Sequence, residues 1–357
     1  MTKTISIHQL IPSFSVGDAI GNHALAIRKA LAGDGYGSTV FAGAAHESLR
    51  SLCRPIRDLP GSVGERDVLL FHFSLGREAI DAFAAFPGRR VLVYHNITPA
   101  EYFDGVNSRV ARQCREGREA LERLAEVADL ALGVSEYNRK DLESAGFKKT
   151  WILPIAVEGG RADGRADPSR LRQFDDGFVN VLHVGRIAPN KKIEDLLKIH
   201  YFFAKVRPLS RLILAGTECD TESYGFALRE MAAALHLQNV LFLGHVSDAE
   251  LAACYRRAHV YVGMSEHEGF CVPIVEAMMR NVPVVAYAAG GVPETLGDGG
   301  VLVRKKKFPE IAELLDLVIR DRPLRERLVL MGRKRANAFS LDALRVCLRR
   351  HLAEVSE

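Results

Sequence analysis

The stretch SEHEGFCVPIVEAMMRNVPVVAYAAGGVPETLGDGGVLV, residues 265–303, decides the fold class of this chain. It follows a short apolar run at 260–262 and contains two more, at 284–287 and 301–303, which we interpret as strands because they are short and rich in Val. Before the second run lies an apolar helical segment with Pro273 in its first turn. Proline is tolerated there because the first N–H groups of a helix have no partner within the helix. Strand, loop, helix and strand in this order predict a parallel sheet with helical crossovers.

The same alternation extends along the rest of the chain. Further strands are predicted at 4–7, 38–42, 68–73, 91–94, 130–134 and 150–153 in the first half, and at 179–184, 211–214 and 240–243 in the second. Helices are predicted between most of them, among others at 22–31 and 108–128, and another at 341–354. Parallel strands need such crossovers, so the whole chain is predicted to be α/β.

The 357 residues exceed the length at which one hydrophobic core usually keeps growing, so two domains are expected. The polar, Gly- and Asp-rich stretch at 158–177 is interpreted as their connection. We predict a Rossmann-like domain at 1–160, a linker at 161–177, a second Rossmann-like domain at 178–337 and a C-terminal helix at 338–357 that packs back on the first domain. Sheets of this kind bind ligands at the carboxyl ends of their strands, in a cleft between the domains.

Composition argues against several classes of protein. A net charge of +4 with a pI near 8.7 is too small for nucleic-acid binding without a concentrated patch. Basic residues cluster at 109–123 and 304–307, which fits solvated faces or contact with an anionic membrane or acidic acceptor. The six scattered cysteines have no metal-ligand spacing. No signal peptide or long apolar run is present, so we expect a cytoplasmic protein, with peripheral contact with the inner membrane left open.

Two glutamates carry the candidate chemistry of the opening stretch. Glu268 precedes the predicted helix and Glu276 lies just inside it, and both carboxylates can accept hydrogen bonds from vicinal sugar hydroxyls. The first backbone N–H groups of the helix and its dipole make a site for a diphosphate or another anion. Two glutamates on a solvated helix are the alternative without chemistry.

A second candidate segment is VLHVGRIAPNKKIEDLLK, residues 181–198. A predicted strand ends at Gly185, and Arg186 and Lys191 follow on the loop, as paired cations suited to a diphosphate. They would stabilise negative charge that develops on a leaving nucleoside diphosphate. Ordinary solvated charges on a loop are the competing interpretation.

In the first half, the candidates are a histidine and a glycine-bearing loop. The buried run at 91–94 delivers His95 to its C-terminal end, where a purely structural histidine is the alternative. The loop SVGDAIGNH at 15–23 fits contact with an acceptor or phosphate, or a plain turn with a helix N-cap. Its candidate residues are Gly17, Asp18, Gly21 and Asn22, and weaker candidates elsewhere are His72, Ser74 and Ser135.

Glu268 and Glu276, with seven residues between them, resemble the E-x7-E signature of the family 4 retaining glycosyltransferases, which have the GT-B fold. The AM-x-x-x-x-PVVA and GG-x-x-E segments that follow, and the G-R-x-x-x-x-K segment that ends at Lys191, are similar to that family too. The resemblance implies that Glu276 binds the nucleotide ribose, that Glu268 binds the transferred sugar, and that His95 contacts the donor sugar near the reacting carbon.

The resemblance also defines an expected donor pocket. Its residues are predicted to be Gly185, Arg186, Lys191, Gly216, His245, Val246, Glu268, Gly269, Phe270, Cys271, Val272 and Glu276. The residues predicted to act in catalysis are His95, Arg186, Lys191 and Glu268. Cys271 and Asn281 stand where the family usually has Gly. Cys271 would change how closely the backbone approaches the phosphate, whereas Asn281 tolerates the left-handed conformation.

With this resemblance, the sequence predicts a retaining hexosyltransferase that acts in bacterial surface polysaccharide or lipopolysaccharide biosynthesis. It would move a sugar, preferably mannosyl from GDP-mannose, from a nucleotide-sugar donor to a hydroxyl of a glycan or lipid-linked acceptor. No metal or other cofactor is expected, because cations face the diphosphate and the chain has no Asp-x-Asp pair for a divalent ion. Two alternatives stay open: a sugar-nucleotide epimerase or hydrolase of the same fold, and a non-catalytic nucleotide-sugar-binding subunit.

Overall fold

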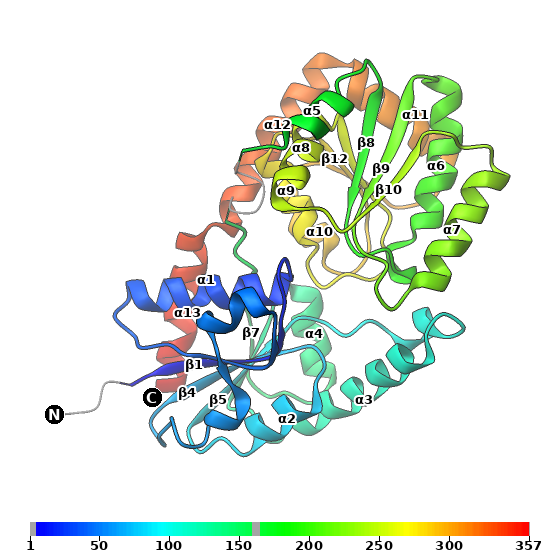
Figure 1. Ribbon diagram of the computed structural model, residues 1–357. Helices are drawn as coiled ribbons and strands as arrows, with labels where there is room; N and C mark the ends of the chain where they lie inside the picture. Colours follow the sequence, from blue (N-terminus) through cyan, green and yellow to red (C-terminus); the bar gives the residue numbers. More distant parts are fainter. Residues whose placement is uncertain (1–4, 159–164, 357) are drawn as a thin grey trace. The chain divides into compact units, whose positions relative to one another are not determined.

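The computed structural model describes residues 5–158 and 165–356 and divides into two compact units (Figure 1). Unit 1 consists of residues 1–100, 111–158 and 339–357, and unit 2 of residues 101–110 and 159–338. The C-terminal helix therefore belongs to unit 1, as predicted from the sequence.

The predicted boundaries differ from the structure in two places. Residues 101–110, predicted in the first domain, group with unit 2. The predicted linker contains a helix, α5 (Pro168–Gln173), whose N-cap is Asp167. The amide of Asp167 donates to the carbonyl of Ala249 in α8 (Asp248–Arg257) at 2.9 Å, which fixes this segment to unit 2. Residues 161–164 of that linker lie outside the described residues.

Unit 1 is built on a parallel sheet of seven strands in the order β3-β2-β1-β4-β5-β6-β7. The strands are β1 (Ile7–Phe14), β2 (Val40–Ala45), β3 (Arg54–Pro55), β4 (Val68–Phe73), β5 (Arg89–Tyr94), β6 (Leu130–Gly133) and β7 (Thr150–Ile152). The helices are α1 (Ala19–Gly33), α2 (Arg77–Ala84), α3 (Ser108–Leu124), α4 (Glu136–Ser144) and α13 (Leu341–Ser356). All six residues of β4 are buried, as expected of a strand with helices on both faces.

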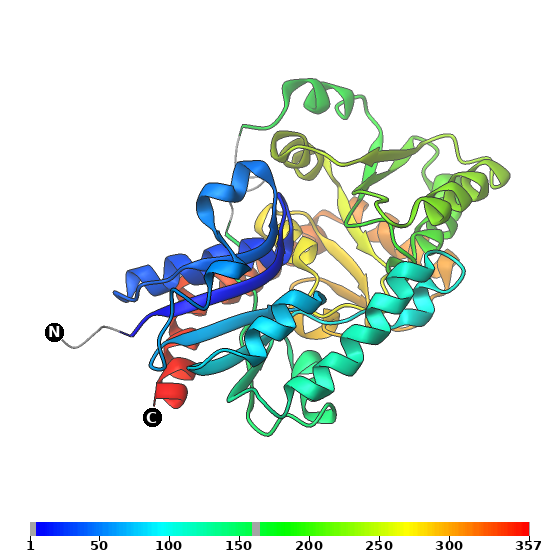
Figure 2. The same ribbon diagram turned by 60° about the horizontal axis from the view of Figure 1, so that its bottom comes forward.

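Helices α1 and α13 pack side by side on one face of this sheet, and α2 lies on the other (Figures 1 and 2). Ion pairs join two arginines of α13 to Asp34, the residue that follows α1. Arg345 Nε lies 2.5 Å from Asp34 Oδ1, and Arg349 Nε lies 2.7 Å from Asp34 Oδ2. The tail helix thereby covers apolar surface of α1 that the first half of the chain leaves open.

Strand β1 departs most from the sequence prediction. A strand was predicted at 4–7, whereas β1 runs from Ile7 to Phe14. The polar residues His8 and Gln9 and the proline Pro12 interrupt the apolar pattern, yet His8 and Gln9 are buried. The other predicted strands agree with the structure within about three residues at each end, and the short strand β3 was not predicted.

Unit 2 contains a parallel sheet of six strands in the order β10-β9-β8-β11-β12-β13. These are β8 (Val179–Val184), β9 (Ser210–Ala215), β10 (Val240–Gly244), β11 (Val260–Gly263), β12 (Val284–Tyr287) and β13 (Val301–Val303). Besides α5 and α8, its helices are α6 (Ile193–Val206), α7 (Glu222–Ala234), α9 (Val272–Met279), α10 (Val292–Leu296), α11 (Phe308–Arg320) and α12 (Arg322–Ala336). Apolar side chains of α6 and α11 bury against β8, β9 and β11 to form its core.

The strand order reverses once in each sheet. In unit 1 the strands after β1 are added on one side of it and the strands after β4 on the opposite side, so the reversal lies between β1 and β4. In unit 2 it lies between β8 and β11. Neighbouring loops diverge at such a switch point and leave a crevice at the carboxyl ends of the two strands, where open α/β sheets bind ligands. The most specific sequence candidates fall on these two switch points.

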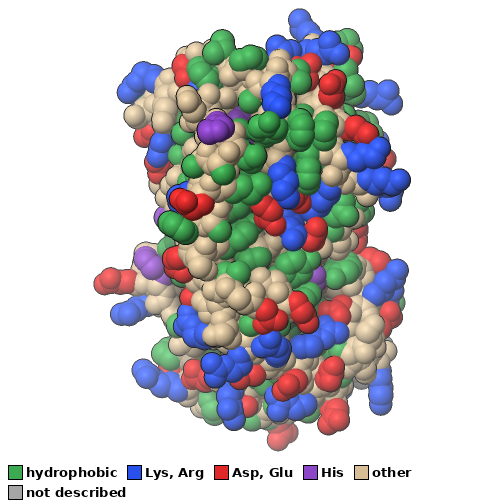
Figure 3. Space-filling model, turned by 90° about the vertical axis from the view of Figure 1, so that its right-hand side faces the viewer, with side chains coloured by type: hydrophobic (Ala, Val, Ile, Leu, Met, Phe, Trp, Pro, Cys, Tyr) green, Lys and Arg blue, Asp and Glu red, His purple; other side chains and the backbone are tan. Residues whose placement is uncertain are grey.

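The surface carries mixed charge. On the face drawn in Figure 3, acidic and basic side chains are interspersed over both units. This agrees with the small net charge of the sequence. Among the helices described, none combines the length and apolar character needed to cross a membrane.

Candidate functional site

The switch point of unit 2 brings together a lysine and a glutamate that are far apart in the sequence. Lys191 follows β8 and Glu268 follows β11, and Lys191 Nζ lies 2.6 Å from Glu268 Oε1. The Lys191 side chain is 21% exposed and that of Glu268 9%, so the pair is largely shielded from water. Burial lowers the pKa of Lys191, but the nearby Glu268 carboxylate more than offsets it and the net pKa is raised. Lys191 is therefore held in its charged form at neutral pH.

The loops that carry these two residues are tied together by Asn190. Its side-chain nitrogen Nδ2 donates to the carbonyl of His267 at 3.1 Å, and its own carbonyl accepts from the amide of Glu266 at 2.9 Å. Asn190 is buried. It is a residue that the sequence analysis missed, although its place between Arg186 and Lys191 in the motif was a signal that could have found it.

The Glu268 loop is supported from behind by the residues of the GG-x-x-E segment. The amide of Gly291 donates to the carbonyl of Glu268 at 2.8 Å, and Thr295 Oγ1 donates to the carbonyl of Phe270 at 2.6 Å. Gly290 has φ +54°, and a Cβ there would overlap the backbone of Glu268. This close approach gives Gly290 a physical reason.

Helix α9 begins directly after this loop. It runs from Val272 to Met279 with Pro273 in its first turn, as predicted. Cys271 is the N-cap, with φ 76° and ψ 69°, and Asn281 beyond the other end has φ 62°. Both positions therefore adopt the left-handed backbone that favours Gly, which explains why the similar family has Gly there. Burial raises the pKa of the Cys271 thiol, so it stays neutral.

Glu276 lies inside α9 and is buried. Its Oε2 accepts a hydrogen bond from the hydroxyl of Tyr255 at 2.9 Å. Tyr255, at the end of α8, was not found from the sequence, because nothing local marks it as a partner of Glu276. The tyrosine occupies one carboxylate oxygen and leaves acceptor capacity on the other for a ligand hydroxyl.

Three glycines form the ends of the strands next to this pair. The amide of Gly185 donates to Ala215 O at 3.0 Å, and that of Gly216 donates to Gly244 O at 2.9 Å. A Cβ at Gly216 would overlap the carbonyl of Gly185, so a side chain is excluded there. Gly185 and Gly216 belong to the predicted donor pocket, as do the buried Val246 and the exposed His245.

Arg186, the second predicted cation, is exposed, unlike Lys191. Its guanidinium lies 5.6 Å from the ring centroid of Phe103, a residue of the 101–110 segment that groups with unit 2. Such a contact is a cation–π interaction, which holds the planar group while leaving its N–H donors available. Phe103 is a further residue that the sequence analysis did not single out.

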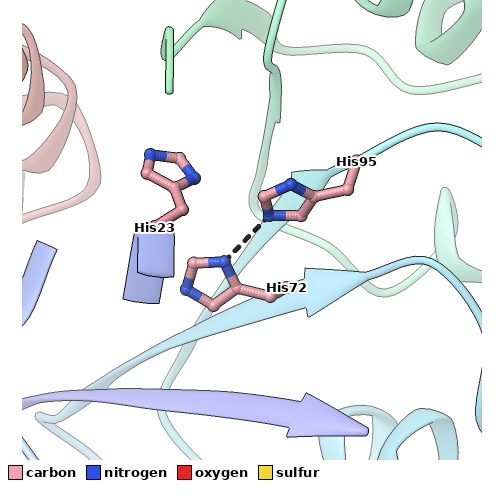
Figure 4. Close-up of side chains that lie close together, drawn as sticks. All are labelled: His23, His72 and His95. Atoms are coloured by element: carbon pink, nitrogen blue, oxygen red, sulfur yellow. Dashed lines mark hydrogen bonds between the residues drawn. The ribbon is translucent and has the colours of Figure 1, made fainter. Parts of the chain in front are cut away.

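The switch point of unit 1 gathers three histidines, shown in Figure 4. His95 directly follows β5, where its amide donates to Phe73 O at 3.0 Å; His72 lies in β4 and His23 in α1. His72 Nδ1 lies 2.9 Å from His95 Nε2. Burial lowers the pKa of all three, that of His23 to about 3, so the rings are neutral at neutral pH. His95 is half-buried, whereas the other two are fully buried.

The loop predicted at 15–23 is shorter in the structure. Helix α1 begins at Ala19, so Gly21, Asn22 and His23 are helical rather than part of the loop. Asp18 is the N-cap, and its Oδ2 accepts from the amide of Gly21 at 3.1 Å. The structure thus has the turn with a helix N-cap that the sequence left as one of two alternatives. Gly17 keeps the loop geometry, with φ 79°.

The weaker candidates have separate roles. Ser135 is the N-cap of α4, where its hydroxyl accepts from the amide of Asn138 at 3.3 Å. Ser74 follows β4 and is half-buried. Of the weaker group, His72 alone joins the cluster around His95.

Comparisons with known proteins agree with this architecture. Residues 170–335 match the family described as "Glycosyl transferases group 1". An uncharacterised glycosyltransferase of Bacillus subtilis, YqgM, is 26% identical over 70% of the chain, which spans 68% of that relative. A GDP-mannose-dependent alpha-mannosyltransferase of Mycolicibacterium smegmatis is 32% identical over 40% of the chain, which spans 34% of it.

The fold is also that of solved glycosyltransferase-like structures. The crystal structure of Anabaena HepE in complex with UDP-glucose superposes with a TM-score of 0.77, at 21% identity, over 98% of this chain and 100% of the other. The predicted pair of parallel α/β units, with the GT-B architecture, is therefore confirmed.

The two sheets and the switch-point residues thus define a protein of the GT-B class. Within that class, residues 170–335 of the chain match the family of group 1 glycosyltransferases.

Proposed function

We propose that the protein transfers a glycosyl group from a nucleotide-sugar donor to an acceptor hydroxyl with retention of anomeric configuration. The observation that carries this proposal is the ion pair of Lys191 with Glu268 beside the first turn of α9. An ammonium, a carboxylate and the start of a helix at one switch point match a diphosphate joined to a hydroxyl-rich sugar.

Each group has a task in this proposal. The Lys191 ammonium has three donors, so it can keep Glu268 in place and still donate to the diphosphate. Arg186 adds a planar donor to the same leaving group, whose negative charge grows as the glycosyl bond breaks. Glu268 accepts hydrogen bonds from the sugar, and Glu276 accepts them from the ribose. Glycosyl transfer then proceeds on one face of the sugar, and the departing phosphate takes the proton of the acceptor hydroxyl.

We further propose that no metal ion takes part in this step. The argument is chemical: Lys191 and Arg186 supply the positive charge that a divalent ion would otherwise bring to the leaving group. The donor favoured is GDP-mannose, in keeping with the name of the mycobacterial relative, while UDP-glucose, found with HepE, is the alternative to exclude.

The acceptor is proposed to be a glycan or lipid-linked glycan of bacterial surface polysaccharide or lipopolysaccharide biosynthesis. It would be bound through unit 1, where the loop of Gly17 and Asp18 precedes α1. His95 is proposed to contact the donor sugar. The reaction would take place in the cytoplasm, with the inner membrane as a surface that the protein contacts without crossing.

A donor panel tests the proposal. The protein is incubated with GDP-mannose, UDP-glucose and ADP-glucose, each with and without a lipid-linked glycan acceptor, in chelator and in Mg²⁺, and products are followed by mass spectrometry and by the anomeric signals in NMR. The expected result is acceptor-dependent transfer from GDP-mannose, with retained configuration and no loss in chelator.

Each other outcome contradicts a named part. Donor consumption without acceptor indicates the epimerase or hydrolase alternative. Binding of GDP-mannose, detected as a raised melting temperature, without turnover on any acceptor indicates the non-catalytic alternative. An inverted product overturns the retaining mechanism, and loss of turnover in chelator overturns the metal-free one.

A further inference from the structure

The histidine cluster of unit 1 is joined to a fourth polar side chain, Gln9 of β1. Gln9 is 0% exposed in the middle of a parallel strand, where a carboxamide is costly unless its groups are hydrogen-bonded. Its Oε1 lies 2.9 Å from His72 Nε2, and His72 Nδ1 in turn lies 2.9 Å from His95 Nε2. The three side chains form one row from a buried strand to the half-buried His95.

The row has a defined proton order. Because a carboxamide oxygen can only accept, His72 Nε2 carries the hydrogen. His72 is neutral, since burial and the neighbouring His23 hold its pKa well below the ordinary value, so its Nδ1 is an acceptor. The Nε2–H of His95 is then the donor of the second bond. His95 is neutral for the same reason, which leaves its Nδ1 without a hydrogen.

The unprotonated nitrogen of His95 is the end of the row that a ligand can reach. In Figure 4 it points away from His72. Among the residues that the structure describes, no group hydrogen-bonds to it, and His95 is half-buried rather than fully buried. A neutral lone pair in this position matches a hydroxyl donor.

We infer that Gln9 and His72 are positioning residues that fix the tautomer of His95, so that its Nδ1 accepts a hydrogen bond from a hydroxyl of the donor sugar. The identity of that hydroxyl group rests on the proposed function. The tautomer rests on contacts inside unit 1 alone, so the two can fail separately.

His23 shields this row. Its ring stands nearly perpendicular to those of His72 and His95, at 83° and 80°, with centroids 5.6 and 5.3 Å away. Neither of its nitrogens has a hydrogen-bond partner within the described residues. One nitrogen from each ring lies within 4.8 Å of the others, which three imidazole ligands of a metal ion would also satisfy. A metal on His95 Nε2 would displace the hydrogen that the bond to His72 requires, so the two arrangements exclude each other.

The tautomers can be measured directly, without any assay of activity. In ¹⁵N-histidine-labelled full-length protein, long-range ¹H–¹⁵N spectra distinguish protonated from unprotonated ring nitrogens. We expect both His72 and His95 to carry hydrogen on Nε2 from pH 6 to 9, in the absence and presence of added Zn²⁺. A His95 with hydrogen on Nδ1, a mixture of the two forms, or Zn²⁺ bound by both rings overturns the inference.

Two substitutions test what sets the tautomer. Gln9→Leu removes the acceptor, and we expect the row to reverse: His72 then donates from Nδ1 to His95 Nε2, and His95 carries hydrogen on Nδ1. The matched control is Ser38→Ala, which removes only the 3.5 Å contact of the Gln9 amide nitrogen and should keep the wild-type tautomers. An unchanged His95 in folded Gln9→Leu overturns the inference; if that variant does not fold, the wild-type spectrum still decides.

The link to the donor is tested by kinetics on the same proteins. With the tautomer reversed, His95 presents a donor where an acceptor is needed, and kcat/KM for the donor should fall about 10-fold, the loss of roughly one hydrogen bond. Ser38→Ala should stay near wild type. A reversed tautomer with unchanged kinetics removes His95 from the proposed reaction but leaves the tautomer assignment standing.

Discussion

The two switch points have the same parallel topology but opposite electrostatic character. At β8 and β11, Lys191 and Glu268 form an ion pair with 2.6 Å between Nζ and Oε1. At β1 and β4, the corresponding space holds imidazoles that burial keeps neutral. A charged pair can exchange partners with a charged ligand, whereas a neutral row fixes the direction of hydrogen bonds. The fold therefore supplies the position, and the side chains decide whether the position handles charge or hydroxyl groups.

The largest effect is expected from a substitution that removes the ion pair at the switch point of unit 2. Replacing Lys191 by Asn removes the ammonium next to Glu268, and kcat/KM should fall at least about 100-fold, or about 3 kcal/mol of transition-state stabilisation. The variant also leaves Glu268 buried without its partner, so the free energy of unfolding should decrease. Steady-state kinetics and urea unfolding measure the two effects separately.

The neighbouring Lys192→Asn is the matched control for this change. Lys192 is paired with Glu194 at 3.5 Å and Glu266 at 3.3 Å rather than with Glu268, and its φ of 54° suits Asn. Loss of such partly exposed pairs is worth at most about 1 kcal/mol, so its kinetics should stay within about 5-fold of wild type. Equal losses in both variants would contradict the assignment of Lys191.

The second expected effect tests the neutral switch point of unit 1 through the pH dependence of its stability. His23 has a pKa of about 3 in the fold, so the unfolded chain binds its proton first as the pH falls below 6.5. Its contribution to stability is complete above about pH 6.5 and is lost towards pH 3, with about 2 kcal/mol lost between pH 7 and 5. Lys191 of unit 2 has a raised pKa and does not titrate in that window.

Hydrogen exchange can locate this effect. Amides of β4 in unit 1 should lose protection between pH 7 and 5, after correction for intrinsic exchange rates, and His23→Phe should reduce that loss. The amides of β8 in unit 2 serve as the internal control, because the substitution lies in the other unit. A pH response of β4 that is the same in wild type and His23→Phe would show that the fold does not lower the pKa of His23.

The smallest expected effect concerns the backbone around α9. Asn281 has φ 62°, so Asn281→Ala should cost about 1 kcal/mol of unfolding free energy, whereas Asn281→Gly should be nearly neutral. Urea unfolding of the two variants is the measurement. Equal stability of both would mean that the turn relaxes out of the left-handed region.

The charged half was predictable from the sequence, and the neutral half largely was not. Lys191, Glu268 and Glu276 lie in continuous motifs, each following a strand that its apolar run identifies. The neutral row of Gln9, His72 and His95, and the His23 ring beside it, come from four different segments that meet only in the folded unit. His95 and His72 were candidates, but their bond and its extension to Gln9 depend on strand register.

The misplaced first strand has the same cause. His8 and Gln9 broke the apolar pattern that predicts a buried strand, so the strand was placed too early. Gln9 is polar because it bonds to His72, which is a tertiary requirement and leaves no local signal. The N-cap at Asp18 was a local possibility that the sequence offered beside ligand contact, and the structure has that cap.

The tail helix α13 has a consequence for synthesis of the chain. Unit 2 has all of its residues by position 338, whereas unit 1 needs residues 339–357 to cover α1 and to pair Asp34 with Arg345 and Arg349. The unit whose strands leave the ribosome first is therefore the last to be completed. Until then α1 lacks the helix that packs against it, so unit 1 has to stay incompletely packed for longer than unit 2.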